Sequence, residues 1–174
     1  MSFRFLTAGE SHGRGLVGIL EGIPSGLEIS TSLIFEQLQR RKLGYGRGAR
    51  QKIETDEVEI LSGIRAGKTL GSPIALLIWN QDWPAWRSIM GAEAAGKGTA
   101  ASDPRSTQRE VQVPRPGHAD LVGGIKYSHP DMRNVLERAS ARETTMRVAL
   151  GSVAQVFLAD LGIALGSRVV RIGT

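Results

Sequence analysis

Short apolar runs separated by glycine-containing turns dominate the first eighty residues, and this pattern predicts β-strands. The runs span residues 3–8, 16–21, 57–61 and 74–79. The turn between the first two is unusually rich in glycine, running from Gly9 to Gly15. A helix is expected between the second and third runs, capped by Ser30 or Thr31 and ending by Gly44.

The clearest helical pattern lies near the end of the chain, over residues 142–161. Its apolar positions recur at helical spacing: Met146, Ala149, Leu150, Val153, Val156, Phe157 and Leu161. Gly162 supplies a C-terminal stop, and residues 163–172 then predict one more strand. Strands mixed with helices, without regular βαβ alternation, predict an α+β fold.

Residues 80–117 read as one long loop, because glycine and proline are scattered among small and polar residues. A loop of this length in a compact domain is usually a functional lid or a disordered excursion. The length of 174 residues suits one domain covering residues 1–174.

Composition places the chain among soluble proteins. It is 41% hydrophobic, and we find neither an apolar run that could cross a bilayer nor a signal peptide. No membrane association is therefore expected. Cysteine is absent, which agrees with a reducing compartment, and a cytoplasmic location is expected.

The net charge of +5 is concentrated between residues 31 and 52. This segment has a single acidic residue, Glu36, and six basic ones: Arg40, Arg41, Lys42, Arg47, Arg50 and Lys52. Such a positive field suits a phosphorylated metabolite, a nucleotide or a nucleic-acid backbone. A solvated basic surface is the alternative.

The turn Gly9-Glu10-Ser11-His12-Gly13 matches the G-x-S-x-G pattern of a serine nucleophile. That pattern requires a following helix, and residues 14–19 are a poor helix start because they contain two glycines and β-branched residues. A second interpretation is an anion site, with Ser11 as hydroxyl donor and His12 as acid. A plain tight turn is the third.

A second histidine follows a sharp turn. Pro116 and Gly117 would present His118, and Asp120 is close enough in sequence to orient or charge it. His129, beside Pro130, lacks such a setting and is expected to be structural.

Two arginine pairs complete the candidate residues. Arg41 and Arg47 bracket a glycine-rich bend that lets two guanidinium groups converge on phosphate or carboxylate oxygens. Arg138 and Arg142 are spaced i, i+4, with an exposed pair partnered by Glu143 as the alternative. No phosphate loop, dinucleotide turn or metal-ligand spacing is found, so no metal site is expected.

Three of these blocks together resemble the signature segments of the chorismate synthase family. They are GESHG at 9–13, RPGHADL at 115–121 and RASARET at 138–144. RRKLGYGR at 40–47 and VEILSG at 58–63 are similar to intervening family segments. The resemblance runs over nearly the whole chain, in order.

The resemblance implies a carbon–oxygen lyase of the shikimate pathway, in aromatic amino acid biosynthesis. The family converts 5-enolpyruvylshikimate 3-phosphate to chorismate by anti-1,4 elimination of phosphate, and requires reduced FMN without net redox change. It also implies a β-α-β sandwich, present here as its N-terminal part, and assembly as a homotetramer.

The resemblance also implies residue roles. His12 would protonate the departing phosphate, and His118 would lie beside the reduced flavin. Ser11, Arg41 and Arg47 would bind the substrate, and both arginines are positions linked to NADPH as a possible reductant. Arg138, Ala139 and Ser140 would bind FMN.

Family members are about twice as long as this chain, so the remaining flavin contacts and the carboxylate that assists ring-proton removal are missing. We therefore expect the half-length chain to be inactive alone. Residues 168–174 alternate like a strand with nothing after them to cover it, so self-association is also expected.

Two other functions compete with this one. A nucleic-acid-binding module would use the basic residues at 40–52, but only 5% of residues are aromatic and no nucleic-acid motif is present, so no nucleic-acid partner is expected. A serine hydrolase would use Ser11 and react with a fluorophosphonate.

Overall fold

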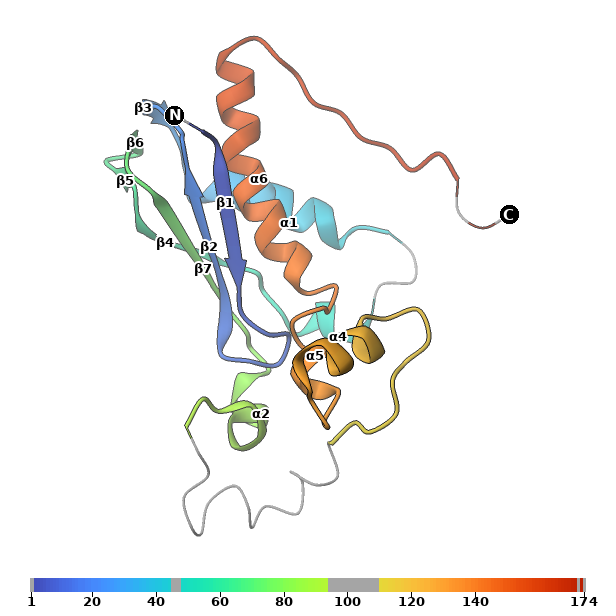
Figure 1. The fold of residues 1–174 in the computed structure, drawn as a ribbon. Coiled ribbons are helices and arrows are strands. Elements are labelled where there is room, and N and C mark those ends of the chain that lie inside the picture. Colours follow the sequence, from blue (N-terminus) through green and yellow to red (C-terminus); the bar gives the residue numbers. More distant parts are fainter. Residues whose placement is uncertain (1, 45–47, 94–109, 172, 174) are drawn as a thin grey trace.

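A computed structural model describes residues 2–44, 48–93, 110–171 and 173. Within these residues the fold is mixed α/β with antiparallel sheets, and the two longest helices lie against one face of the main sheet (Figure 1). None of the helices in the described ranges is long and apolar enough to span a membrane.

The main sheet has the order β1-β2-β7-β4, and all its neighbours are antiparallel. Its strands are β1 (Arg4–Ala8), β2 (Gly15–Glu21), β7 (Ile74–Trp79) and β4 (Val58–Ser62). All four were predicted from the apolar runs. A smaller sheet was missed, because its strands are too short for an alternating pattern: β3 (Ser25–Glu28), β6 (Lys68–Leu70) and β5 (Ile64–Arg65).

The core lies between the main sheet and helices α1 (Thr31–Lys42) and α6 (Glu143–Asp160). Alternate residues of the central strands are buried in it: Leu16, Leu20, Ile74, Leu76 and Ile78. Strand side chains alternate between faces, so one face of the sheet is directed at the helices. The predicted helix at 142–161 is confirmed as α6.

Helix α1 begins as the sequence indicates. The Ser30 hydroxyl accepts a hydrogen bond from the backbone N–H of Leu33 at 3.4 Å, which partners one of the free donors of the first turn. Basic residues occupy the last turn, where they complement the helix dipole. A short 3-10 helix, η1 (Ala49–Lys52), follows.

Two expectations are wrong. The loop predicted at 80–117 contains the helix α2 (Trp83–Met90). Scattered proline favours a loop, but Pro84 lies in the first turn of this helix, a position with which proline is compatible. Residues 94–109 of the predicted loop lie outside the described residues. The strand predicted at 163–172 is not formed over the described residues 163–171, which are exposed and extend away from the sheets (Figure 1). Alternation indicates only that a segment could pair, and here no neighbouring strand accepts it.

The segment after residue 110 forms helices α4 (Asp120–Tyr127) and α5 (Arg133–Leu136). Together with α2 they lie at the end of the main sheet where β1 turns into β2 (Figure 1). This end carries the candidate site.

Candidate functional site

The glycine-rich turn joins β1 to β2, two antiparallel strands. Gly9 has φ +105°, and a Cβ atom there would collide with the carbonyl of Gly15, so the turn requires glycine at this position. A nucleophile elbow connects a strand to a helix. Since a strand and not a helix follows Ser11, the serine-hydrolase hypothesis is wrong.

Ser11 is buried in this turn. Its backbone N–H donates to the carbonyl of Glu137 at 2.9 Å. Its hydroxyl oxygen lies 2.6 Å from Nη1 of Arg50 and 3.1 Å from the Ser140 hydroxyl, and Arg50 also donates to the Ser11 carbonyl. Ser11 thus joins the turn, η1 and the 138–144 segment.

His12 is held by Glu137, a residue from the far end of the sequence. The Nδ1 atom of His12 lies 2.8 and 3.0 Å from the two carboxylate oxygens, and the His12 backbone N–H donates to the same carboxylate at 2.9 Å. The ring stacks on Trp86 of α2 with centroids 3.9 Å apart. Its other nitrogen, Nε2, lies 3.8 Å from Asp82.

The Glu137 carboxylate is completely buried and also accepts a 2.6 Å hydrogen bond from Arg133. Burial raises the pKa of Glu137, but hydrogen bonds and charge from His12, together with the hydrogen bond from Arg133, outweigh burial and leave this pKa below its ordinary value. Glu137 is therefore ionised at neutral pH and presents only acceptors to His12.

The residues predicted to bind FMN lie beside this turn. Arg138 donates to the carbonyl and the hydroxyl of Thr7 at 2.7 Å each, and lies 3.7 Å from Glu143. Its side chain is still 40% exposed, and Ala139 is exposed. Ser140 is the residue that contacts Ser11.

Arg138 and Arg142 do not form the exposed pair that was the alternative interpretation, because α6 begins only at Glu143 and Arg142 is buried. Its guanidinium donates to Asp56, to Glu54 at 3.2 Å and to Asn80 at 3.0 Å. Asn80 in turn donates to carbonyls of the turn at residues 10 and 13. This buried polar network connects the glycine-rich turn to Arg142 through Asn80.

His118 occupies a second cluster. Gly117 has φ +72°, as the predicted sharp turn requires, and Nδ1 of His118 contacts the carboxylate of Asp120. Asp120 is buried and also accepts from Arg115 at 2.9 Å. Hydrogen bonds and charge from Arg115, with a hydrogen bond from His118, outweigh burial and lower the pKa of Asp120 to about 2. The predicted orientation of His118 by Asp120 is confirmed. The backbone N–H of His129 donates to the carbonyl of Gly124 at the end of α4, and its ring lies near that of Tyr127.

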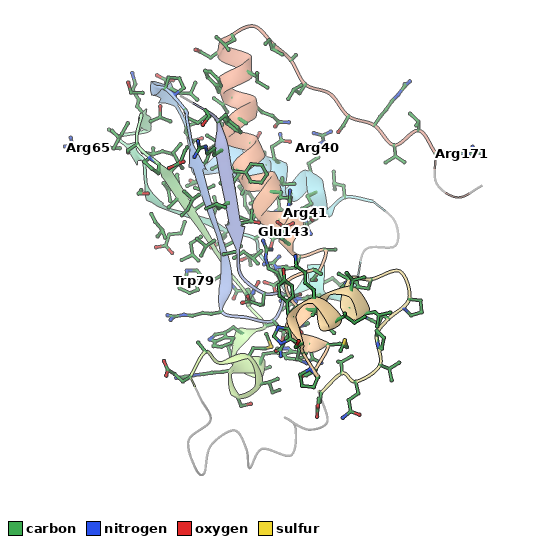
Figure 2. All side chains as sticks on the ribbon, in the orientation of Figure 1. Arg40, Arg41, Arg65, Trp79, Glu143 and Arg171 are labelled. Carbon is green, nitrogen blue, oxygen red and sulfur yellow. The ribbon has the colours of Figure 1, made fainter. Side chains whose placement is uncertain are left out.

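Arg41 lies at the end of α1 and contacts the start of α6 (Figure 2). Its Nε donates to the Thr144 hydroxyl at 3.1 Å and its Nη2 to the carbonyl of Ala141 at 3.0 Å. Arg47 lies outside the described residues, so the predicted convergence of the two guanidinium groups stays a prediction.

Ser11, His12 and Ser140 are therefore brought together, with Arg138 close by, while His118 belongs to a neighbouring cluster. Sequence reasoning missed the partners of His12, namely Glu137, Trp86 and Asp82. Glu137 lies 125 positions from His12, and no spacing rule connects them. Arg50 was noted only as part of the basic segment. Among the residues that the structure describes, no group of three or more His, Cys, Asp or Glu residues could hold a metal ion.

A histidine held on a carboxylate, beside hydroxyl and guanidinium donors, is an arrangement that suits acid–base chemistry on an anionic ligand. The comparisons with known proteins give the family. The chorismate synthase family model matches residues 3–174, and the chain belongs to this family.

Individual relatives support the same assignment. "Chorismate synthase 1" of Bacillus cereus is 56% identical over 170 residues, covering 98% of this chain and 43% of the relative. "Chorismate synthase" of Aquifex aeolicus is 58% identical, covering 98% and 41%. A solved structure, "Crystal Structure of Chorismate Synthase", superposes with a TM-score of 0.65 at 45% identity, covering 94% of this chain and 36% of that one. The chain thus spans less than half the length of these relatives.

Proposed function

We propose that this chain contributes the acid and part of the anion site to a lyase of the shikimate pathway. The reaction is the anti-1,4 elimination of phosphate from 5-enolpyruvylshikimate 3-phosphate, giving chorismate. The observation that carries the proposal is the His12–Glu137 pair in the turn, with Ser11 and Arg50 beside it. Family membership supports the choice of reaction.

The residues suit phosphate departure. Negative charge grows on the leaving phosphate as the C–O bond breaks, so a proton donor and positioned cations lower the barrier. In this proposal His12 donates the proton from Nε2, because Nδ1 is occupied by Glu137. Ser11, Arg41 and Arg47 bind the phosphorylated substrate.

The residues present also suit an anionic flavin. Arg138 is a partly exposed cation, and the exposed Ala139 leaves space next to it. We assign Arg138, Ala139 and Ser140 to FMN binding, and His118, held on Asp120, to balancing negative charge near the cofactor. When bound there, reduced FMN would supply electron density to the allylic system, a task that no side chain performs. Arg41 and Arg47 are also candidates for NADPH binding.

The proposal extends to assembly. Leu33 and Phe35 leave apolar surface exposed on α1, which a further layer would cover. A second sheet packed on the helices would complete a β-α-β sandwich. We propose this arrangement for the full-length protein, as a homotetramer in the cytoplasm.

The test is an anaerobic assay of a full-length protein that carries these residues, with reduced FMN and the enolpyruvyl substrate. Release of phosphate together with chorismate is expected, and absence of both would refute the proposed function. Residues 1–174 alone are expected to be inactive. Salt-sensitive binding of RNA or DNA, without phosphate release, would favour the nucleic-acid alternative.

A further inference from the structure

We propose that Glu137 is the positioning residue that sets the tautomer of His12, holding hydrogen on Nδ1 so that Nε2 is the atom that delivers the proton. This inference rests on the proposed function, in which His12 is the acid. It concerns a residue that the sequence did not single out and that touches neither substrate nor cofactor in the proposal.

The first argument is geometric. Both carboxylate oxygens of Glu137 lie within 3.0 Å of Nδ1 of His12, and one of them also accepts the His12 backbone N–H. The Glu137 carbonyl accepts the N–H of Ser11 at 2.9 Å. One residue therefore holds both the ring and the backbone of the turn.

The second argument is chemical. Hydrogen bonds from His12 and Arg133 keep Glu137 ionised despite its burial, and an ionised carboxylate can only accept hydrogen bonds. A neutral His12 can satisfy this contact only with its hydrogen on Nδ1, since a bare nitrogen would oppose its lone pair to the carboxylate. Arg133 restrains the carboxylate from the other side, at 2.6 Å.

The third argument is the direction of Nε2. Trp86 covers one face of the ring, and the His12 side chain retains 24% of its exposure. A carboxylate oxygen of Asp82 lies 3.8 Å from Nε2, and that oxygen already accepts from the Trp86 indole at 2.9 Å. Nε2 therefore lies beyond hydrogen-bond distance of Asp82, in a side chain that is partly exposed.

The proton step balances with these groups. The imidazolium of His12 gives its Nε2 proton to the phosphate oxygen as the substrate C–O bond breaks, and the bonding electrons leave with phosphate. The ring is left neutral with hydrogen on Nδ1. Throughout, the negative charge of Glu137 faces the ring, so the ring does not have to rotate or exchange tautomers.

The direct test is long-range ¹H–¹⁵N spectroscopy of the histidine rings in the 174-residue chain, at a pH where neutral imidazole is observed. Unsubstituted protein should show the Nδ1–H form of His12, with His118 and His129 as internal references. The Nε2–H form in unsubstituted protein would overturn the proposal, whatever any variant does.

Substitutions then test whether Glu137 sets the tautomer of His12. Glu137→Gln replaces an acceptor-only group with an amide that can accept or donate, so a mixture of tautomers is expected. Glu143→Gln is the matched control, because Glu143 is also an arginine-paired glutamate, with a side chain that is 14% exposed, but contacts Thr7 instead of His12. A His12 tautomer unchanged in Glu137→Gln would show that other groups set it and would refute the proposal.

Turnover of a full-length protein carrying these residues gives an independent measurement. Glu137→Gln should lower kcat by about 10–10⁴-fold with little change in KM, as losing the correct tautomer does in other histidine enzymes. In a His12→Ala background the same substitution should have no further effect, because Glu137 acts through His12. An additive loss would contradict the proposal. If the unsubstituted protein lacks the activity, the proposed function fails while the ring spectra still decide the tautomer.

Discussion

Each of the two candidate histidines lies against a buried carboxylate that an arginine also holds. Glu137 and Arg133 serve His12, and Asp120 and Arg115 serve His118. An ionised carboxylate accepts a hydrogen bond from the imidazole and restricts the orientation of the ring. The shared arrangement suits one histidine to proton donation and the other to balancing negative charge.

Replacing either histidine with alanine should lower turnover of a full-length protein that carries these residues. We expect each loss to be about 10–10⁴-fold, the range for a missing general acid or electrostatic partner. Steady-state kinetics across pH 6–9 measures it. His129→Ala is the control, because His129 closes α4 through its backbone and should tolerate the change. Wild-type turnover in both His12→Ala and His118→Ala would contradict the assignment.

Asp120 should make stability depend on pH in acid. Its pKa is lowered to about 2, so its stabilising contribution is present above the unfolded value of about 3.9 and is lost as pH falls through about 2. Because Arg115 is half exposed, we expect only about 1–2 kcal/mol from this group. Urea unfolding at pH 2 to 7 should show a smaller acid loss in Asp120→Asn than in wild type.

The exposed Asp160→Asn variant controls for net charge. An acid loss that is equally large in Asp120→Asn and wild type would mean that other carboxyl groups dominate acid unfolding.

At the residue scale, the sequence predicted contacts between residues that are close in sequence. Asp120 lies two positions from His118, so their contact could be inferred directly. Glu137 and His12 meet only because the 138–144 segment returns to the first turn, and neither charge nor periodicity encodes that meeting. The burial of Arg142 could not be inferred from the sequence for the same reason, since Glu54 and Asp56 come from a distant part of the chain.

At the scale of elements, α6 packs closely on β2 because Gly18 lacks a side chain. A Cβ atom at Gly18 would lie 2.5 Å from Sδ of Met146 and 2.9 Å from Leu150. Gly18→Ala should therefore overpack the interface and lower the free energy of unfolding by about 1–3 kcal/mol. Urea or thermal unfolding measures this loss.

Gly151→Ala, in the middle of α6, is the matched substitution. A Cβ atom there meets open space, so alanine should stabilise the helix by about 0.5–1 kcal/mol. Equal effects of the two substitutions would show that helix propensity, and not packing against β2, governs this region.

The arginines at the end of α1 and shortly after it in sequence should matter for ligand affinity. Arg41 already uses its fork on Thr144 and Ala141, so Arg41→Lys keeps the charge but loses the bidentate geometry. We expect Arg41→Lys and Arg47→Lys each to weaken substrate binding by a full-length protein several-fold or more. Arg40→Lys is the control, since Arg40 contacts Ser167 on the exposed side. Unchanged calorimetric affinity in both variants would make this segment a solvated basic surface.

The elements that the sequence predicted well are those whose pattern repeats over a strand or helix in the core. Strands β1, β2, β4 and β7 and helices α1 and α6 have that repetition. Helix α2 does not, because none of its residues is buried in the core. Residues 163–171 alternate convincingly but remain exposed, since strand formation depends on a partner and not on propensity alone.

At the scale of the molecule, the chain spans 43% of the Bacillus cereus relative, while the FMN-binding residues that we assign are few and partly exposed. A cofactor must satisfy its contacts together to offset the freedom it loses on binding. Residues 1–174 should therefore bind reduced FMN far more weakly than a full-length family member does. Anaerobic calorimetric titration of both proteins, with Arg138→Ala as a variant of each, measures the difference. Tight stoichiometric binding by the 174-residue chain, accompanied by chorismate formation, would show that these residues alone make a complete site.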